Sequence, residues 1–273
     1  AAAALTLGTI GALGAILTVM AEDPGVRVPV IMYHAVMDDA SRLGKYVISP
    51  EELESDFKWL SENGYTAVLS EDLINYTESG AALPEKPILL TFDDGYYNNY
   101  LYAYPTAKRY GMKFVLSPIG KYADLYTETP DKSPYYAHCT WDMLREMQSS
   151  GVVEIANHTY DLHSSDGARL GTKQISGESL EDYTKLLTED VTLFQQKAEE
   201  NLQSKPVLFA YPFGAVSKGE PEIIKNLGFK VTLSCEERVS TVTRAPESLY
   251  YLGRYLRPSG VNSESFFEHI LKA

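Results

Sequence analysis

The sequence predicts an α/β fold built on a parallel sheet. Short apolar runs, typical of buried strands, alternate along the chain with longer segments of helical periodicity, and turn residues separate them. Such alternation favours parallel strands joined by right-handed crossovers, with the functional site at the carboxyl ends of the strands. With 273 residues, 44% of them hydrophobic, the chain can form one sizeable core, and we expect one domain over residues 22–273.

The individual elements follow from apolar runs and helix signals. The capping-box pattern Ser49-Pro50-Glu51-Glu52 predicts a helix that stops at Asn63-Gly64. The stretch between Gly120 and Trp141 has no clear period, so we expect a loop there. The other predicted helices are a Tyr-rich one ending at 110 and those at 141–149, 178–202, 220–227 and 263–272; the predicted strands are 28–33, 65–69, 88–92, 113–116, 152–156, 207–211 and 229–233.

Residues 1–21 contain no charge and predict a signal peptide or a membrane anchor. As a helix rising 1.5 Å per residue, this segment would span roughly 30 Å, about the thickness of the hydrocarbon core of a bilayer. We therefore expect an extracytoplasmic protein, secreted or anchored to a bacterial cell membrane. Cys139 and Cys235 are expected to be unpaired, because separation in sequence says nothing about their distance in space.

The net charge of -13 makes nucleic acid an unsuitable partner. Phosphate binding needs a concentrated basic surface, and the 24 basic residues are scattered among 37 acidic ones. The charge balance favours a neutral or cationic ligand.

Polar residues follow four predicted strands, each at its carboxyl end. They are Tyr33-His34, Asp93-Asp94-Gly95, Asn157-His158 and Pro212-Phe213-Gly214. Because such ends meet at one edge of a parallel sheet, the four segments are expected to converge on one mouth.

Thr91-Phe92-Asp93-Asp94-Gly95 places two carboxylates together after an apolar strand. Mutual repulsion and desolvation make both ionised forms costly unless a cation is present, so a divalent metal would resolve the conflict. The alternative is an ordinary turn, since Asp-Gly is common in turns.

His158 and His163 are five positions apart. On a helix this separation turns the second ring about 140° from the first, so a loop must carry the pair. With Asp94 they would form a two-His, one-carboxylate site for Zn²⁺ that leaves positions open for water and substrate. Taken singly, each His could equally be a hydrogen-bonded surface or core residue.

The blocks TFDDG, His-Thr-x-x-x-His and Phe-Ala-Tyr-Pro-Phe-Gly, in this order, resemble the polysaccharide deacetylases of carbohydrate esterase family 4. The resemblance runs from about Val28 to the C-terminus and implies an irregular (β/α)7 barrel as a single catalytic domain. It also implies Asp93 as catalytic base, Asp94, His158 and His163 as ligands of one divalent metal, and the Tyr211 backbone N–H as a donor to the oxyanion.

The chain departs from the commoner family pattern at three points. The five-residue His spacing is similar to that of biofilm poly-N-acetylglucosamine deacetylases, where the commoner pattern has four. Ala210 stands where an Arg usually braces the base, and Arg254 is a candidate replacement, although Arg244 and Arg257 are near it in sequence. No late Leu-x-His motif supplies the general acid, and His269 lies in a helical context.

His34 is the candidate for the missing acid. The biofilm-type enzymes resemble this chain in having a Tyr-His pair at the end of the first strand, here Tyr33-His34. The alternative is a core histidine packed beside Tyr33.

The resemblance implies a hydrolase that removes N-acetyl groups from an amino-sugar polymer, such as peptidoglycan, poly-N-acetylglucosamine or chitooligosaccharide, and releases acetate. An esterase acting on O-acetyl groups of a xylan-type glycan would use the same residues, and a non-catalytic carbohydrate-binding module is a second alternative. Tyr122, Tyr126, Tyr135 and Tyr136 could stack on sugar rings, or could simply anchor a half-buried loop.

Overall fold

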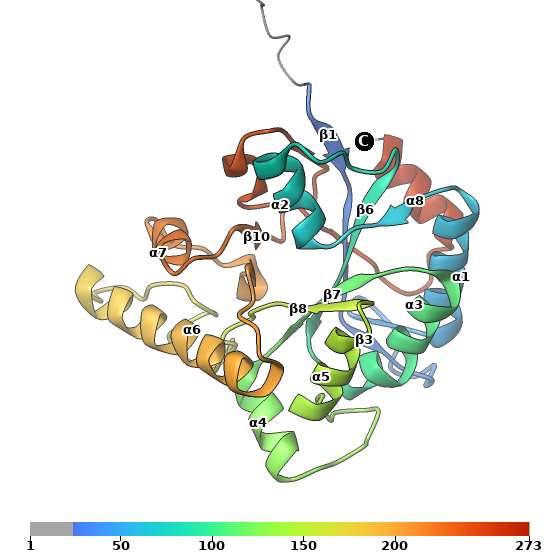
Figure 1. Cartoon of the computed structure of the whole chain (residues 1–273). Helices are drawn as coiled ribbons and strands as arrows, with labels where there is room; N and C mark the ends of the chain where they lie inside the picture. The colour runs from blue at the N-terminus through green and yellow to red at the C-terminus, as the bar shows by residue number, and fades with distance from the viewer. Residues whose placement is uncertain (1–23, 273) are drawn as a thin grey trace, which may run out of the picture.

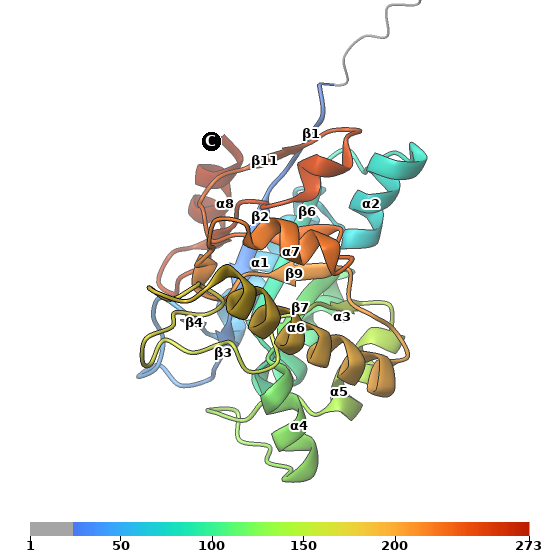
Figure 2. The same ribbon diagram turned by 90° about the vertical axis from the view of Figure 1, so that its left-hand side faces the viewer.

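Parallel strands form the centre of the structure and helices flank them (Figures 1 and 2). The computed structural model describes residues 24–272. Its largest sheet has six strands in the order β12-β2-β6-β7-β8, with β5 paired to β6, and every pairing in it is parallel. These strands are β2 (Val30–Tyr33), β5 (Thr66–Ala67), β6 (Pro87–Asp94), β7 (Phe114–Pro118), β8 (Val153–Ile155) and β12 (Tyr255–Leu256).

A second parallel pair continues the architecture. β9 (Leu208–Ala210) pairs with β10 (Val231–Leu233). Single bridges join Asn157 to Phe209 and Leu233 to Leu252, linking this pair to the segments after β8 and before β12. The predicted α/β fold with a parallel sheet is confirmed. Single bridges do not make continuous ladders, so the closed (β/α)7 barrel stays a prediction.

Four further strands lie outside these sheets. β1 (Val26–Val28) pairs antiparallel with β11 (Ser240–Val242), and β3 (Ala35–Val36) pairs parallel with β4 (Val47–Ile48). The predicted strand 28–33 is therefore interrupted at Pro29, between β1 and β2. The predicted strand 65–69 is only two residues long, as β5.

Helices α1, α3 and α8 lie to the right of the strands in Figure 1, and α6 and α7 lie to the left. The capping box at Ser49 and Glu52 starts α1 as predicted, and α1 ends before Asn63. The helices are α1 (Pro50–Glu62), α2 (Ser70–Ser79), a π-helical turn (Asn99–Ala103) leading into α3 (Tyr104–Tyr110), α4 (Gly120–Glu128), α5 (Trp141–Ser149), α6 (Leu180–Leu202), α7 (Glu220–Asn226) and α8 (Ser263–Lys272), with short 3-10 turns at Pro212–Gly214 and Pro246–Leu249.

Helix α4 corrects the expectation of a loop after Gly120. No side chain caps this helix at Ile119. Instead, the backbone N–H groups of Gly120 and Lys121 donate to the carbonyls of Thr159 and Tyr160 at 3.0 and 2.9 Å. These contacts satisfy donors that the first turn of a helix leaves without partners, and they come from a distant segment. Local sequence patterns therefore could not reveal the helix.

Side chains of β6 alternate between two hydrophobic clusters, as the pleat of a strand requires. Ile88, Leu90 and Phe92 belong to the cluster that includes residues of α1, α3 and α5, whereas Leu89 belongs to the cluster shared with β9 and β10. This alternation sets the directions in which the residues at the end of β6 would point.

Within residues 24–272 no helix is long and apolar enough to cross a bilayer. The predicted signal peptide or anchor at residues 1–21 lies outside the described residues. Cys139 and Cys235 are both free thiols, in agreement with the sequence-based expectation.

Candidate active site

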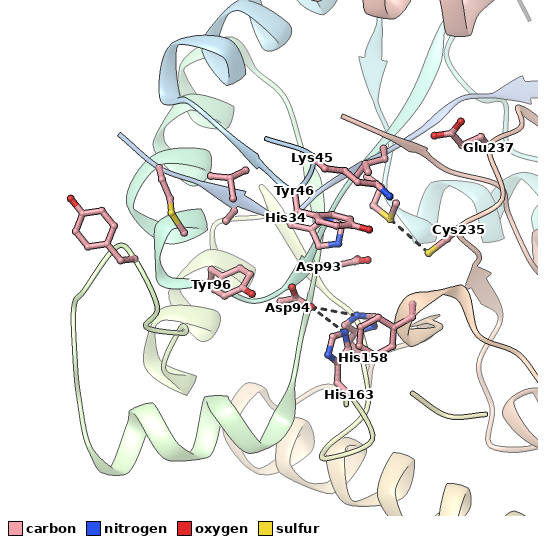
Figure 3. Close-up of a pocket in the computed structure, with 17 residues that line it drawn as sticks. His34, Lys45, Tyr46, Asp93, Asp94, Tyr96, His158, His163, Cys235 and Glu237 are labelled. Carbon is pink, nitrogen blue, oxygen red and sulfur yellow. Dashed lines mark hydrogen bonds and ion pairs between the residues drawn. The ribbon is translucent and has the colours of Figure 1, made fainter. Parts of the chain in front are cut away.

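A cavity of about 660 Å³ opens at the carboxyl ends of the parallel strands. All four predicted strand-end segments contribute to it, through His34, Asp93 and Asp94, His158, and Phe213, so their convergence is confirmed. Figure 3 shows the side chains of His34, Asp93, Asp94, His158 and His163 gathered at its centre. The remaining lining residues are Met32, Ala35, Met37, Lys45, Tyr46, Val47, Tyr96, Tyr135, Cys235, Glu237 and Leu256.

Asp93 and Asp94 both line this cavity although they are consecutive residues of a strand. An ideal strand would send them to opposite faces. Asp94 instead has a φ of 70°, which is uncommon for a residue other than glycine. Gly95 follows with a φ of 73°, and a Cβ there would lie 2.5 Å from the Cβ of Pro118. The turn thus requires glycine after the two aspartates and brings both carboxylates to one side.

Asp94, His158 and His163 offer one ligand atom each, and these atoms lie within 4.8 Å of one another. The Asp94 Oδ1 is 3.7 Å from His158 Nε2 and 3.3 Å from His163 Nε2. Burial raises the pKa of Asp94 to about 6, and burial lowers the pKa of His158 to about 3. Burial also lowers the pKa of His163. The imidazoles are therefore neutral near pH 7 and do not act as cations toward the carboxylate.

This donor set fits a divalent metal. The His158 Nδ1 lies 2.7 Å from the Ala210 carbonyl, which can only accept, so Nδ1 carries the proton and the Nε2 lone pair faces Asp94. The buried Asp94 Oδ1 has no hydrogen-bond donor among the described residues. Tetrahedral zinc with bonds of about 2.0–2.1 Å separates its ligand atoms by roughly 3.3–3.4 Å, close to the two Asp94–His distances.

A loop carries both histidines, as the five-residue spacing predicts. Its backbone is held by Asp190 of α6, whose carboxylate accepts the N–H groups of Tyr160 and Asp161, both at 2.8 Å. The start of α4 holds the same loop from the other side through Gly120 and Lys121. Two helices thus fix the path of the chain between the two imidazoles.

Asp93 differs from Asp94 because it has a cationic partner. Arg254, fully buried, donates from Nη1 to Asp93 Oδ1 at 2.8 Å and from Nε to the Ser234 carbonyl at 2.7 Å. Burial alone would raise the pKa of Asp93, but the Arg254 guanidinium holds it well below its usual range. Arg254 therefore occupies the position that would brace a base at Asp93, while Arg257 pairs with Asp56 elsewhere.

His34 lies on the cavity wall and is only partly buried. Its ring contacts the Tyr46 ring edge-on, with the two ring centroids 4.9 Å apart. Its buried Nδ1 has no hydrogen-bond partner among the described residues. The Asn99 side chain donates to the His34 carbonyl at 2.7 Å. Asn98 accepts the Val36 N–H at 3.0 Å and holds the same segment. His34 is thus a cavity residue and does not pack in the core.

The expectation for Tyr211 is wrong in the structure. Its backbone N–H donates to the Leu233 carbonyl at 3.1 Å, and its side chain is buried outside the cavity wall. Phe213, two residues later, lines the cavity with a φ of 58° and its ring 4.4 Å from that of His163. The motif contributes to the site through Phe213.

Several cavity residues carried no sequence signal. Lys45, Tyr46 and Glu237 lie in segments without a recognisable motif. Cys235 also lines the cavity, and it comes directly after Ser234, whose carbonyl accepts a hydrogen bond from Arg254. Of the tyrosines considered for sugar contacts, Tyr135 lines the cavity. Tyr122 and Tyr126 lie in α4, and His269 is exposed on α8.

Comparison with known proteins identifies the family. Residues 80–232 match the polysaccharide deacetylase family, which covers more than half of the chain and includes the two aspartates and both loop histidines. The chain belongs to the polysaccharide deacetylase family. Relatives of this chain include poly-beta-1,6-N-acetyl-D-glucosamine N-deacetylases of Escherichia coli K12 and Staphylococcus aureus N315. The first is 26% identical over 78% of this chain, and the second is 24% identical over 85% of it.

This chain spans 34% of the length of the Escherichia coli relative and 73% of the Staphylococcus aureus one. Two solved structures share the fold. A de-N-acetylase from Aggregatibacter actinomycetemcomitans has a TM-score of 0.74 and 28% identity, covering 89% of this chain and 100% of that one. IcaB from Ammonifex degensii has a TM-score of 0.71 and 27% identity, covering 90% and 96%.

We expect His163→Ala to weaken Zn²⁺ or Co²⁺ binding by at least about 10-fold, because it removes a direct ligand of the ion. Substitution of a residue that only supports a metal ligand already lowers metal affinity about 10–100-fold. Competition with a chromophoric chelator measures the affinity. The matched control is His269→Ala, which changes an exposed histidine on α8 and should leave the affinity unaltered. Equal affinities in the two variants would rule out His163 as a ligand.

Proposed function

We propose that this chain is a metal-dependent N-deacetylase of an amino-sugar polymer. The proposal rests on one observation: the cavity contains both a set of possible metal ligands and a separate carboxylate paired with an arginine. Asp94, His158 and His163 converge without a cation among the described side chains that contact them, and beside them Asp93 is held by Arg254. Such a pairing fits hydrolysis, in which one group of residues holds a metal and a separate carboxylate moves a proton.

Asp94, His158 and His163 are the proposed ligands of one divalent metal, which we take to be Zn²⁺. When bound there, the ion would polarise the acetyl carbonyl and make a water molecule more acidic. The Ala210 carbonyl orients the His158 ring by accepting its Nδ1–H. Asp190 orients the loop that carries His163.

Asp93 is the proposed general base. Arg254 keeps it ionised, and the single contact from Nη1 to Oδ1 leaves the second carboxylate oxygen for the attacking water. A carboxylate with a low pKa is a weak base toward ordinary water, so its role depends on a water made acidic in the site. Arg254 is in this account a positioning residue, since it acts through Asp93.

His34 is the proposed general acid. An amide cannot easily expel an amine anion, so the departing nitrogen must receive a proton as its bond to carbon breaks. The His34 ring lies at the cavity wall, directly after β2, which is the strand next to β6, and Asp93 lines the same cavity. We assign the backbone donor to the developing oxyanion to the Phe213 N–H, because Phe213 is the residue of the Tyr-Pro-Phe motif that lines the cavity.

The proposed substrate class rests on the relatives and on the cavity. The named relatives are poly-beta-1,6-N-acetyl-D-glucosamine N-deacetylases. A cavity of about 660 Å³ is large enough for a sugar ring, and its wall includes the aromatic residues Tyr46 and Tyr135. A polymer of this kind lies outside the cytoplasm, so we propose an extracytoplasmic location, secreted or anchored through residues 1–21.

Acetate release tests this function directly. The panel is poly-N-acetylglucosamine, chitooligosaccharide, peptidoglycan and acetylated xylan, each with and without a chelator. We expect acetate from at least one N-acetylated polymer, loss of release with chelator, and recovery on adding Zn²⁺. Release from xylan alone would make the chain an O-acetyl esterase, and no release from any polymer with metal bound would favour a carbohydrate-binding module.

We expect Asp93→Asn to keep metal binding while lowering turnover about 10²-fold or more, because the side chain moves a proton and does not anchor the ion. Turnover is measured as acetate release, and metal content by elemental analysis. Asp161→Asn, a surface change in the histidine loop, is the matched control. If Asp93→Asn lost metal and activity together while remaining folded, Asp93 would be a ligand.

His34→Ala should bind metal normally and lose deacetylation of N-acetylglucosamine oligomers, yet retain appreciable hydrolysis of an activated acetate ester. The physical reason is that a good leaving group departs without a proton, whereas an amine does not. The ratio of the two activities is the measurement. Near wild-type rates on both substrates would contradict the assignment of His34.

A further inference from the structure

His138 is a buried histidine that does not line the catalytic cavity. Its Nδ1 lies 2.9 Å from the backbone carbonyl of Asp94. Since a carbonyl oxygen can only accept, the His138 Nδ1 carries a proton and donates it to this bond. A residue 44 positions away thus contacts the backbone, and not the carboxylate, of a proposed metal ligand.

The Asp94 carbonyl has few other donors. In the parallel ladder, Asp94 is opposite Pro118, which has no N–H, and the next residue, Ile119, donates to the Asp94 carbonyl only at 3.4 Å. The His138 bond is shorter by half an ångström than the Ile119 bond. It is therefore the stronger hydrogen bond on this peptide group.

The segment around His138 is itself fastened to the turn. Tyr96 and His138 form an antiparallel bridge, the Cys139 N–H donates to the Gly95 carbonyl at 2.8 Å, and the Tyr97 N–H donates to the Ala137 carbonyl at 2.7 Å. Residues 137–139 thus lie along residues 95–97 as a short strap, which places the imidazole beside Asp94.

Two tyrosine rings orient the imidazole. The Tyr122 ring of α4 stacks on it with centroids 4.4 Å apart, and the Tyr96 ring lies 4.7 Å away. The ring thus presents one fixed donor to the Asp94 carbonyl.

We propose that His138 is a positioning residue that holds the Asp94 peptide in its left-handed conformation, so that the Asp94 carboxylate faces His158 and His163. This inference rests on the proposed function, because it gives His138 a role toward the metal ligands. Without the bond, the Asp94 backbone can relax toward the extended conformation of a strand, in which consecutive side chains point to opposite faces.

Three substitutions separate the hydrogen bond from the ring. His138→Phe keeps an aromatic ring beside Tyr96 and Tyr122 and removes the donor. His138→Asn loses the ring but places an amide N–H near the position of Nδ1, whereas His138→Gln places its amide beyond that position. We expect Phe and Gln to weaken Co²⁺ affinity about 10–100-fold and to alter the Co²⁺ absorption spectrum. Asn should restore both toward wild type.

Affinity is measured by chelator competition on the full chain, with circular dichroism to confirm folding of each variant. His269→Phe is the matched control and should match wild type. Wild-type affinity and spectrum in the Phe or Gln variant would overturn the inference, and so would equal weakening in Asn. If wild-type protein bound no Co²⁺, the ligand set of the proposed function would fail and this inference with it, whereas the other outcomes leave that function standing.

Discussion

The backbone turn at Asp94 decides where the chemistry of this protein can take place. A strand that continued regularly would separate the Asp93 and Asp94 carboxylates onto opposite faces of the sheet. The left-handed φ of Asp94 costs roughly 1–3 kcal/mol for a residue other than glycine. Gly95, packed against Pro118, and the hydrogen bonds from His138 and Cys139 compensate for this cost. Each of these hydrogen bonds contributes about 0.5–1.5 kcal/mol, so no single one offsets the cost and the surroundings must act together.

Once both carboxylates face the cavity, their surroundings divide their roles. Asp93 is paired with Arg254 and stays ionised. Burial raises the pKa of Asp94, whose carboxylate faces the neutral imidazoles of His158 and His163. Two carboxyl groups in such different environments are suited to different tasks, one as a proton acceptor and one as a metal ligand. The chain belongs to the polysaccharide deacetylase family, and the division of roles between the two carboxylates is our proposal.

Sequence reasoning located the site because apolar strands ending in Asp, His or Pro can be recognised along the chain, and the parallel topology brings those ends together. The sequence patterns could not predict which residues from distant segments contact one another. Arg254 was one of three candidate arginines, and only the fold places it 2.8 Å from Asp93. His138 carries no local pattern, because its role depends on a strap that pairs with Tyr96. Tyr211 was misassigned because a motif does not show which backbone N–H is already bonded within the sheet.

The central claim is that Asp94, His158 and His163 together hold one metal ion beside a separate base. Crystallography of zinc-loaded protein, with anomalous data collected at the zinc edge, tests it most directly. We expect a single ion about 2.0–2.2 Å from Asp94 Oδ1, His158 Nε2 and His163 Nε2, with Asp93 still paired to Arg254. An ion bound by the Asp93 carboxylate, or one that leaves either histidine uncoordinated, would contradict the account.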